Sequence, residues 1–189
     1  ALVPLYLRTC FQDTNVGRAI AVLTIHNLKF QGIYDRKMIQ YWSGLPDYVF
    51  NKDCMIQNWL DANMLKGGIA YCNKITTVSN TYAGEIQTEE YGEGLAEHLR
   101  YHNNKIRGIV NGIDTDNWNP ATDKLLTANY DAESAVENKK INKQALQESL
   151  GLEVDDHKMV IGLISRLTNQ KGLDLVNAVI PGIMDEHTQ

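Results

Sequence analysis

The chain has little cysteine and little proline. Its 189 residues include three cysteines and four prolines. Cys10, Cys54 and Cys72 are odd in number and widely spaced, with no Cys-x-x-Cys pair, which argues against a disulfide framework and against a cysteine zinc site. Reduced thiols of this kind are typical of cytosolic proteins, so we expect a cytoplasmic location.

Positive charge is also scarce. Lys and Arg number 18 against 23 Asp and Glu, a net charge of −5, whereas general nucleic-acid binders are basic. A local basic pair remains able to bind a small anion. No apolar run reaches the roughly 18 residues of a membrane span, and no signal peptide is recognisable. Because the first residue is Ala1 and not Met, we expect an internal piece of a longer protein.

The charge is divided unevenly along the chain. Residues 1–112 carry 11 basic and 10 acidic side chains, and residues 113–189 carry 7 and 13. A segment dense in turn-forming residues, Asp114–Pro120, follows the change and is typical of a hinge. The chain as a whole, with 43% hydrophobic residues, has the material for a core. The change in charge and the turn-rich segment predict a domain boundary near Asn111 and Gly112.

The first part alternates strand and helix patterns. Continuous apolar, β-prone runs predict strands that are buried on both faces of a parallel sheet, at Ala19–Ile25, Lys74–Val78 and Lys105–Val110. Between them the sequence predicts a helix over Asp61–Cys72, with core positions Leu60, Met64, Ile69 and Ala70. A second helix is expected over Asn80–Gln87, with Ser79 as its cap. This order is the pattern of an α/β fold with parallel sheets flanked by helices.

The second part begins another α/β unit. A helix is predicted over Asp131–Leu150, ended by Gly151, with an apolar stripe of Ile141, Ala145, Leu146 and Leu150. Lys158–Ile164 has the composition of a buried strand. A last helix places Leu173, Val176, Ile180 and Ile183 on one face, and Pro181 is expected to kink or restart it.

The loop Ser165–Gly172 is the strongest candidate for an anion site. It would leave the carboxyl end of a strand and enter a helix N-terminus, where free N–H groups favour an anion. Arg166 supplies a planar fork for phosphate oxygens and Lys171 a mobile charge. The loop lacks the glycine frame of a Walker A motif. A solvated basic loop is the alternative.

Two further polar sites follow predicted strands. His26 and Asn27 come after the first strand. The histidine suits proton transfer and the asparagine suits contact with sugar hydroxyls, or the histidine only caps the strand end. Asn111 and Gly112 follow the third strand, where a tight turn and a ligand contact by Asn111 are both open readings.

Metal sites have weak support. Asp114 and Asp116 are spaced to hold a divalent cation, but Asx residues are equally common in turns. His98 and His102 lie four residues apart, with no third ligand apparent, so a surface helix face is the simpler reading. We therefore expect neither a metal nor another cofactor.

Taken together, the motifs resemble the family of bacterial glycogen synthases and plant starch synthases. The resemblance covers nearly the whole chain and is carried, in order, by Thr24–Gly32, Leu65–Gly68, Ile75–Ser79, Tyr82–Ile86, Gly108–Asp114, Trp118–Asp123, Asn142–Lys143 and Ser165–Val176. One such motif would be weak, whereas the ordered series is specific.

The resemblance implies a GT-B architecture, in which two Rossmann-like domains enclose the active site. Residues 1–112 would be the C-terminal half of the N-terminal, acceptor-side domain. Residues 113–189 would be a linker and the start of the nucleotide-sugar domain. The implied reaction is retaining transfer of glucose from ADP-glucose to the non-reducing end of an α-1,4-glucan, without a metal.

The resemblance also implies roles for four residues. His26 corresponds to the histidine beside the donor glucose, either as proton donor or as a group that positions the sugar. Asn111 corresponds to the asparagine that contacts the sugar, and Arg166 and Lys171 to the pair on the diphosphate.

Two family motifs are absent, the N-terminal Lys-x-Gly-Gly loop and the Glu-x₇-Glu motif. We therefore expect this piece to be inactive alone, and to self-associate if it is stable, because a partial sheet exposes an edge. Two alternatives stay open: a non-catalytic module that binds nucleotide or glucan, and a retaining glycosyltransferase with another donor or acceptor.

Overall fold

The computed structural model describes residues 1–58 and 60–189. The chain divides into two compact units, Ala1–Gly112 and Ile113–Gln189, and each is described by itself. The division falls where the charge of the sequence changes. Within the described residues, no helix is both long enough and apolar enough to cross a membrane.

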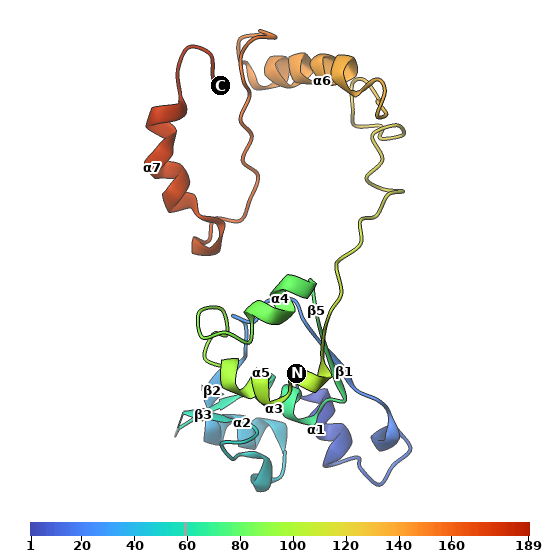
Figure 1. The fold of residues 1–189 in the computed structure, drawn as a ribbon, viewed down its shortest axis with the longest axis vertical. Coiled ribbons are helices and arrows are strands. Elements are labelled where there is room, and N and C mark those ends of the chain that lie inside the picture. The colour runs from blue at the N-terminus through green and yellow to red at the C-terminus, as the bar shows by residue number, and fades with distance from the viewer. Residues whose placement is uncertain (59) are drawn as a thin grey trace. The chain divides into compact units, whose positions relative to one another are not determined.

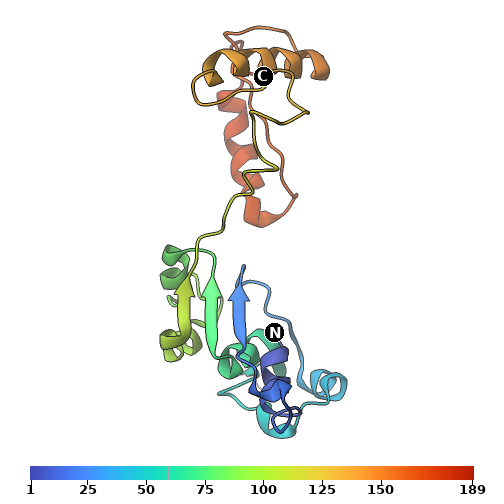
Figure 2. The same ribbon diagram turned by 90° about the vertical axis from the view of Figure 1, so that its right-hand side faces the viewer.

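The first unit is built on a parallel sheet of three strands. Its strands are β1 (Val22–Ile25), β5 (Lys74–Thr77) and β6 (Ile106–Gly108), in the order β1-β5-β6. Figure 2 shows the three side by side with their arrows in one direction. Leu23 is paired with Ile75 and Ile75 with Ile106, which brings apolar residues from all three strands into one row. The three predicted strands and their parallel pairing are confirmed.

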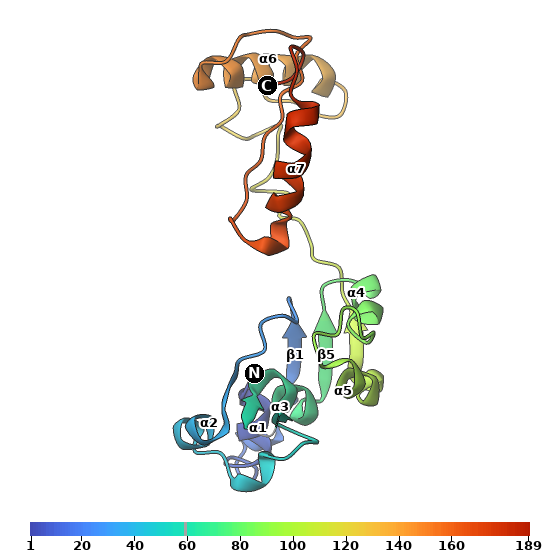
Figure 3. The same cartoon turned by 90° about the vertical axis from the view of Figure 1, so that its left-hand side faces the viewer.

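One face of this sheet is buried and the other is not. Ile25, Ile75 and Ile106 are buried, whereas Val22 and Arg107, which point to the opposite face, are exposed. The prediction that the strands are buried on both faces is therefore wrong for these residues. The helices α3 (Met64–Tyr71), α4 (Asn80–Glu85) and α5 (Ala96–Tyr101) all lie on the buried side (Figures 1 and 3).

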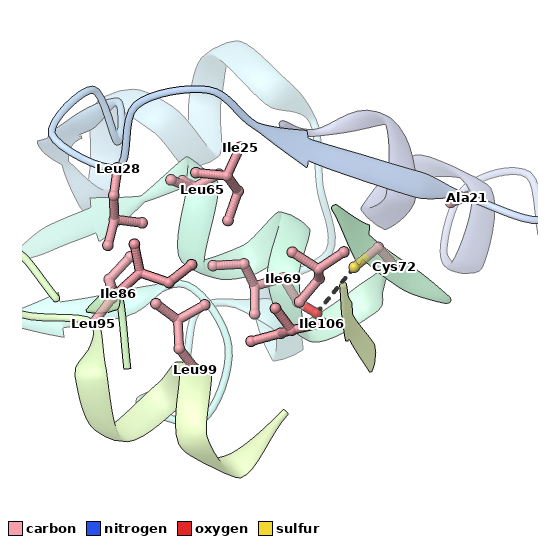
Figure 4. Close-up of a cluster of buried hydrophobic side chains, with 11 residues drawn as sticks. Ala21, Ile25, Leu28, Leu65, Ile69, Cys72, Ile86, Leu95, Leu99 and Ile106 are labelled. Atoms are coloured by element: carbon pink, nitrogen blue, oxygen red, sulfur yellow. Dashed lines mark hydrogen bonds between the residues drawn. The ribbon is translucent and has the colours of Figure 1, made fainter. Parts of the chain in front are cut away.

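Burial of apolar side chains holds these helices on the sheet. Figure 4 shows the cluster, in which Leu65 and Ile69 of α3 and Leu99 of α5 meet the isoleucines of the strands. Its other members come from the segments that join the strands and helices: Ala21, Leu28, Cys72, Ile86 and Leu95. Each fully buried aliphatic side chain of this kind contributes roughly 1.5–3 kcal/mol.

A second, smaller layer packs beside the sheet. It contains an antiparallel sheet in the order β2-β4-β3, formed by Ile33–Asp35, Asp61–Asn63 and Ile56–Asn58. The helices α1 (Val3–Arg8) and α2 (Arg36–Ser43) and the short 3-10 helices Val16–Arg18, Asp47–Val49 and Asn103–Lys105 complete the unit. Its core comprises Leu5, Ile39, Leu45, Val49, Phe50, Cys54, Met55 and Ala62.

The helix predicted over Asp61–Cys72 is shorter than expected. Residues 61–63 form β4 because they pair with β2 and β3, and the helix begins at Met64 with the Asn63 side chain as its cap. Leu60, predicted as a core position, is exposed, whereas Ile69 is fully buried. Long-range strand pairing has therefore overridden the local helical pattern.

Arg8 joins three segments of the first unit. Its guanidinium donates to the carbonyl oxygens of Gly17 and Ala19 and to Asn73 Oδ1, the last two at 2.8 Å. The same Asn73 oxygen accepts the N–H of Ala21 at 2.9 Å. Helix α1 is thereby tied to the amino ends of β1 and β5.

The second unit consists of two helices and an extended segment. The helices are α6 (Ala135–Leu150) and α7 (Leu173–Ile183), with a short 3-10 helix, Asn169–Lys171, before α7. Gly151 ends α6 in the left-handed conformation, as predicted. Helix α7 continues through Pro181 without a break and ends two residues later.

The predicted strand Lys158–Ile164 does not form. The segment makes one isolated parallel bridge, Met159 with Thr188, and most of its apolar side chains are exposed. The apolar stripe of α6 is also largely exposed, and Gln147 is the one buried residue of that helix. A buried strand needs neighbours on both edges, and the described residues of this unit supply only the last residues of the chain.

Candidate functional site

The carboxyl ends of β1, β5 and β6 meet at one edge of the parallel sheet. His26 follows β1 directly, Ser79 follows β5 by two residues, and Asn111 follows β6 by three. Ligands of open parallel sheets bind outside this edge. The fold therefore brings two of the four predicted site residues, His26 and Asn111, to the edge where a ligand is expected.

The turn that carries His26 is held in place by hydrogen bonds of the residues that follow it. Leu28 is fully buried, and its N–H donates to Tyr82 Oη at 3.1 Å. Asn27 Oδ1 accepts the N–H of Lys29 at 3.0 Å, which closes an Asx turn. The His26 ring is exposed and makes no hydrogen bond to another described residue. The backbone of the turn is thus fixed while the imidazole stays free to meet a ligand.

The following residues, Gln31 and Gly32, dock onto the start of α3. The buried Asn63 donates to Gln31 Oε1 at 2.5 Å and also to Gln57 Oε1. Met64 N–H donates to the Gly32 carbonyl at 3.1 Å. Gly32 has a φ of +67°, a left-handed conformation that strains other residues. These bonds explain why Gln31, a polar residue of the Thr24–Gly32 motif, is buried.

The edge after β5 and β6 is shaped by a cap and a glycine. Ser79 Oγ accepts the N–H of Tyr82 at 2.9 Å and so caps α4, as predicted. A Cβ on Gly108 would lie 2.3 Å from the Ser79 carbonyl oxygen, so only glycine lets β6 approach the start of α4 this closely. In the sequence, Tyr82 and Gly108 stand out only as members of motifs. For Gly108, the position of a glycine directly at a strand end was the available signal.

Asn111 lies in an irregular segment beyond β6. Ile109 N–H donates to the Thr77 carbonyl at 2.8 Å, which is the last backbone bond between this segment and the sheet. Asn111 and Gly112 are exposed, and the Asn111 side chain has no hydrogen-bond partner among the described residues. Its amide is therefore available to a ligand.

Arg166 and Lys171 lie in the second unit, in the loop that enters α7. Lys171 N–H donates to the Thr168 carbonyl at 2.9 Å, and Gly172, with a φ of +64°, is the N-cap residue that precedes α7. Both cationic side chains are exposed, and neither forms an ion pair with a described carboxylate. The first turn of α7 also carries Asp174, so the cations stand beside one acidic group. The loop presents two unpaired cations, as an anion site requires.

The alternative metal readings find no support in the described residues. Asp114 accepts the N–H groups of Asp116 and Asn117 and the Asn117 amide, and these bonds hold the pKa of its carboxyl below the usual range. The pair thus forms a turn. Within the described part of the chain, no group of three or more possible ligands comes together.

His98 and His102 are half-buried and stack edge to face, with ring centroids 4.8 Å apart. Burial, with a smaller effect of the Lys105 charge, lowers the pKa of His98; the same two causes and the neighbouring His98 lower the pKa of His102 to about 4. His98 Nε2 lies 3.1 Å from the Lys66 carbonyl, which can only accept, so this nitrogen carries the proton. Both rings are therefore neutral at physiological pH and packed into the structure of α5.

Comparison with known proteins identifies the family. The family model described as the starch synthase catalytic domain matches residues 1–101. A glycogen synthase of Lachnospira eligens is 49% identical over 189 residues, all of this chain and 39% of the relative. A glycogen synthase of Thermotoga petrophila is 50% identical over 185 residues, 97% of this chain and 37% of the relative.

A solved structure shares the fold. It is the catalytic domain of starch synthase IV from Arabidopsis thaliana bound to ADP and acarbose, with a TM-score of 0.88, 34% sequence identity, and coverage of 99% of this chain and 38% of that one. The chain thus spans about two fifths of the length of the relatives it matches. The expected α/β architecture of the GT-B class is confirmed, and the chain belongs to the starch synthase catalytic domain family.

Proposed function

We propose that this chain forms part of a glycogen synthase, which transfers glucose from ADP-glucose to the non-reducing end of an α-1,4-glucan and retains the anomeric configuration. The observation that carries this proposal is the similarity over the whole chain to glycogen synthases, at 49% identity. Because the chain covers 39% of that relative, the activity is proposed for the longer protein. Residues 1–112 are assigned to its acceptor-side domain and residues 113–189 to the linker and the start of its nucleotide-sugar domain.

Four residues carry the proposed chemistry. In the first unit, His26 would lie beside the donor glucose and Asn111 would contact the sugar; both are exposed and follow strands of the parallel sheet. In the second unit, Arg166 and Lys171 would bind the diphosphate, and both lack a carboxylate partner among the described residues.

The reaction breaks the bond between glucose C1 and the diphosphate oxygen and forms a bond from C1 to the acceptor 4-oxygen on the same face of the sugar. The acceptor hydroxyl gives its proton to the departing diphosphate or to solvent, and negative charge develops on the diphosphate as the bond to C1 breaks. Fixed cations that meet this charge lower the barrier most when they bind the transition state more tightly than the substrate. Arg166 and Lys171 supply that role without a metal or another cofactor.

The nature of the ligands is supported by the solved relative, which is bound to ADP and acarbose. Its ADP is the leaving group of the proposed reaction. We propose ADP-glucose as donor and an α-1,4-glucan as acceptor, with no role for nucleic acid or a membrane. We further propose a cytoplasmic location, and self-association of the present chain through the free edge of β1.

The test measures transfer of labelled glucose to glycogen by the longer protein, with ADP-glucose and UDP-glucose compared as donors. We expect Arg166→Ala and Lys171→Ala each to lower turnover by about 10²–10³-fold while the circular dichroism spectrum is unchanged. Lys124→Ala is the matched control, because Lys124 is also an exposed lysine of the second unit. Near-normal turnover in both variants would refute the assignment to the diphosphate.

The role of His26 is tested separately. His26→Ala is expected to reduce turnover under either reading of this residue. His26→Asn keeps a hydrogen-bonding group but cannot transfer a proton near neutral pH. Recovery of activity in the Asn variant would favour positioning of the sugar, and equal loss in both variants would favour proton transfer.

A further inference from the structure

Asn111 and Gly112 form the only Asn-Gly pair in the sequence. In such a pair the backbone nitrogen of the glycine can attack the asparagine side chain most readily, because glycine has no Cβ and reaches the widest range of φ and ψ. Both residues are exposed, and Gly112 is the last residue of the first unit. The sequence therefore places a reactive pair where solvent reaches it.

The groups that would react are not held by hydrogen bonds. Ile109 N–H makes the last bond of this segment to the sheet, to the Thr77 carbonyl at 2.8 Å. Beyond it, no described residue donates to or accepts from residues 110–113, through the backbone or through a side chain. The Asn111 amide and the Gly112 N–H group are thus free to turn towards each other.

Steric crowding does not oppose this approach. A Cβ added to Gly112 would meet no heavy atom within 4 Å. Val110 and Ile113, on either side of the pair, are 70% and 80% exposed. A segment with so few contacts changes its backbone conformation at a low cost in free energy. Ring closure needs such a change, since the Gly112 nitrogen must come into contact with Asn111 Cγ.

Asn117 shows the opposite arrangement. It is exposed as well, but its Nδ2 donates to Asp114 Oδ2 at 2.6 Å. The next nitrogen in the chain, that of Trp118, donates to the Asp114 carbonyl at 2.9 Å and belongs to a residue with a large side chain. Both reacting groups are therefore held at Asn117. The freedom of both groups, and not exposure alone, distinguishes Asn111.

We propose that Asn111 is a site of spontaneous deamidation, with water as the co-reactant. The Gly112 nitrogen gives its proton to solvent base and attacks Asn111 Cγ. As the new bond closes a succinimide ring, the bond from Cγ to Nδ2 breaks, and Nδ2 takes a proton from water and leaves as ammonia. Water then adds to one of the two ring carbonyls and opens the ring, which gives aspartate or isoaspartate.

The products differ from asparagine in charge and in shape. The Asn111 amide can donate and accept hydrogen bonds, whereas the carboxylate that replaces it can only accept. Isoaspartate also carries the main chain through the former side chain, which adds a methylene before Gly112. Both products lack the amide donor, so glucose transfer is lost as the site converts. This last consequence rests on the proposed function, whereas the modification itself does not.

The test incubates the longer protein in mildly alkaline buffer and follows each asparagine by peptide mapping and mass spectrometry. We expect Asn111 to show the mass change of an amino group replaced by a hydroxyl, as aspartate and isoaspartate, while Asn117 stays unchanged. Gly112→Ala, whose Cβ meets no clash, is the matched variant and should slow the conversion about tenfold or more. In urea, Asn111 of the unfolded protein should convert at nearly the native rate.

An Asn111 amide that persists in the native protein but converts in urea would overturn the proposal, because the fold would then protect the pair. Equal conversion rates in Gly112→Ala and the unchanged protein would also refute it. Glucose transfer is measured on the same samples. Loss of transfer in proportion to converted Asn111 supports the sugar contact, and conversion with transfer intact would exclude that contact alone. A longer protein without any transfer at the start would exclude the proposed function and leave the mass measurement unaffected.

Discussion

Replacing Tyr82 with phenylalanine tests whether one hydroxyl group holds the turn that carries His26. The Leu28 N–H group donates to Tyr82 Oη at 3.1 Å, and Leu28 is 0% exposed. Tyr82→Phe keeps the ring and its packing but removes the hydrogen-bond acceptor of this amide, which belongs to a fully buried residue. An unsatisfied buried donor costs about 1–3 kcal/mol, so the free energy of unfolding of the first unit is expected to fall by that amount.

Hydrogen exchange at the Leu28 amide is the most direct assay. A loss of about 1–3 kcal/mol corresponds to exchange that is roughly 5- to 150-fold faster at this amide. Urea unfolding followed by fluorescence gives the global value for comparison. Tyr41→Phe, at a tyrosine exposed on α2, is the control and should change neither quantity. Unchanged exchange at Leu28 together with unchanged stability would show that the hydroxyl does not hold the turn.

Two other perturbations follow from the same unit. Gly108→Ala places a Cβ 2.3 Å from the Ser79 carbonyl and is expected to cost about 2 kcal/mol or more in urea unfolding, whereas Gly112→Ala, whose Cβ meets nothing within 4 Å, should be neutral; equal stability of both variants would contradict this. Acid should also destabilise the unit, because burial lowers the folded-state pKa of His98 and His102, the latter from 6.5 to about 4. The unfolded chain then binds protons first, so stability is constant above about pH 7 and falls between pH 6.5 and 4. Urea midpoints measured across this range should show the decline, and a curve just as steep in His102→Gln would exclude this histidine as its source.

Local features of the fold could be predicted from sequence because their causes lie within a few residues. Ser79 caps α4 through a bond to an N–H three residues later, and Gly151 ends α6 because it adopts a left-handed conformation without strain. The β-prone runs became β1, β5 and β6 because Ile25, Ile75 and Ile106 have one common face to bury. In each case the local structure is the one that the residue types of that segment favour.

Features that depend on distant partners were missed. Asp61–Asn63 joined a sheet because β2, nearly 30 residues earlier, offers a pairing edge. Lys158–Ile164 has the composition of a strand, but within the described residues only Thr188 forms a β-bridge with it. An apolar composition indicates that a segment can be buried. It does not indicate whether a neighbouring strand is present to cover that segment.

The candidate site also combines features that the local sequence predicts with features that depend on distant residues. Sequence position placed His26 after a strand, and the structure adds what fixes its turn: the Tyr82 hydroxyl, 54 residues away along the chain.

The Arg8 bonds have a consequence for the order in which the first unit opens. Because one guanidinium links α1 to the residues before β1 and to the residue before β5, the amino ends of these strands are cross-braced by a single charged group. At the opposite ends, the His26 turn is held by bonds between neutral groups, among them the bond to the Tyr82 hydroxyl and the bond that closes the Asn27 turn. Hydrogen bonds to charged groups are stronger than neutral ones, so thermal fluctuations should fray the sheet from its carboxyl edge inward. The edge assigned to substrate is thus the part of the domain that can rearrange at the lowest cost.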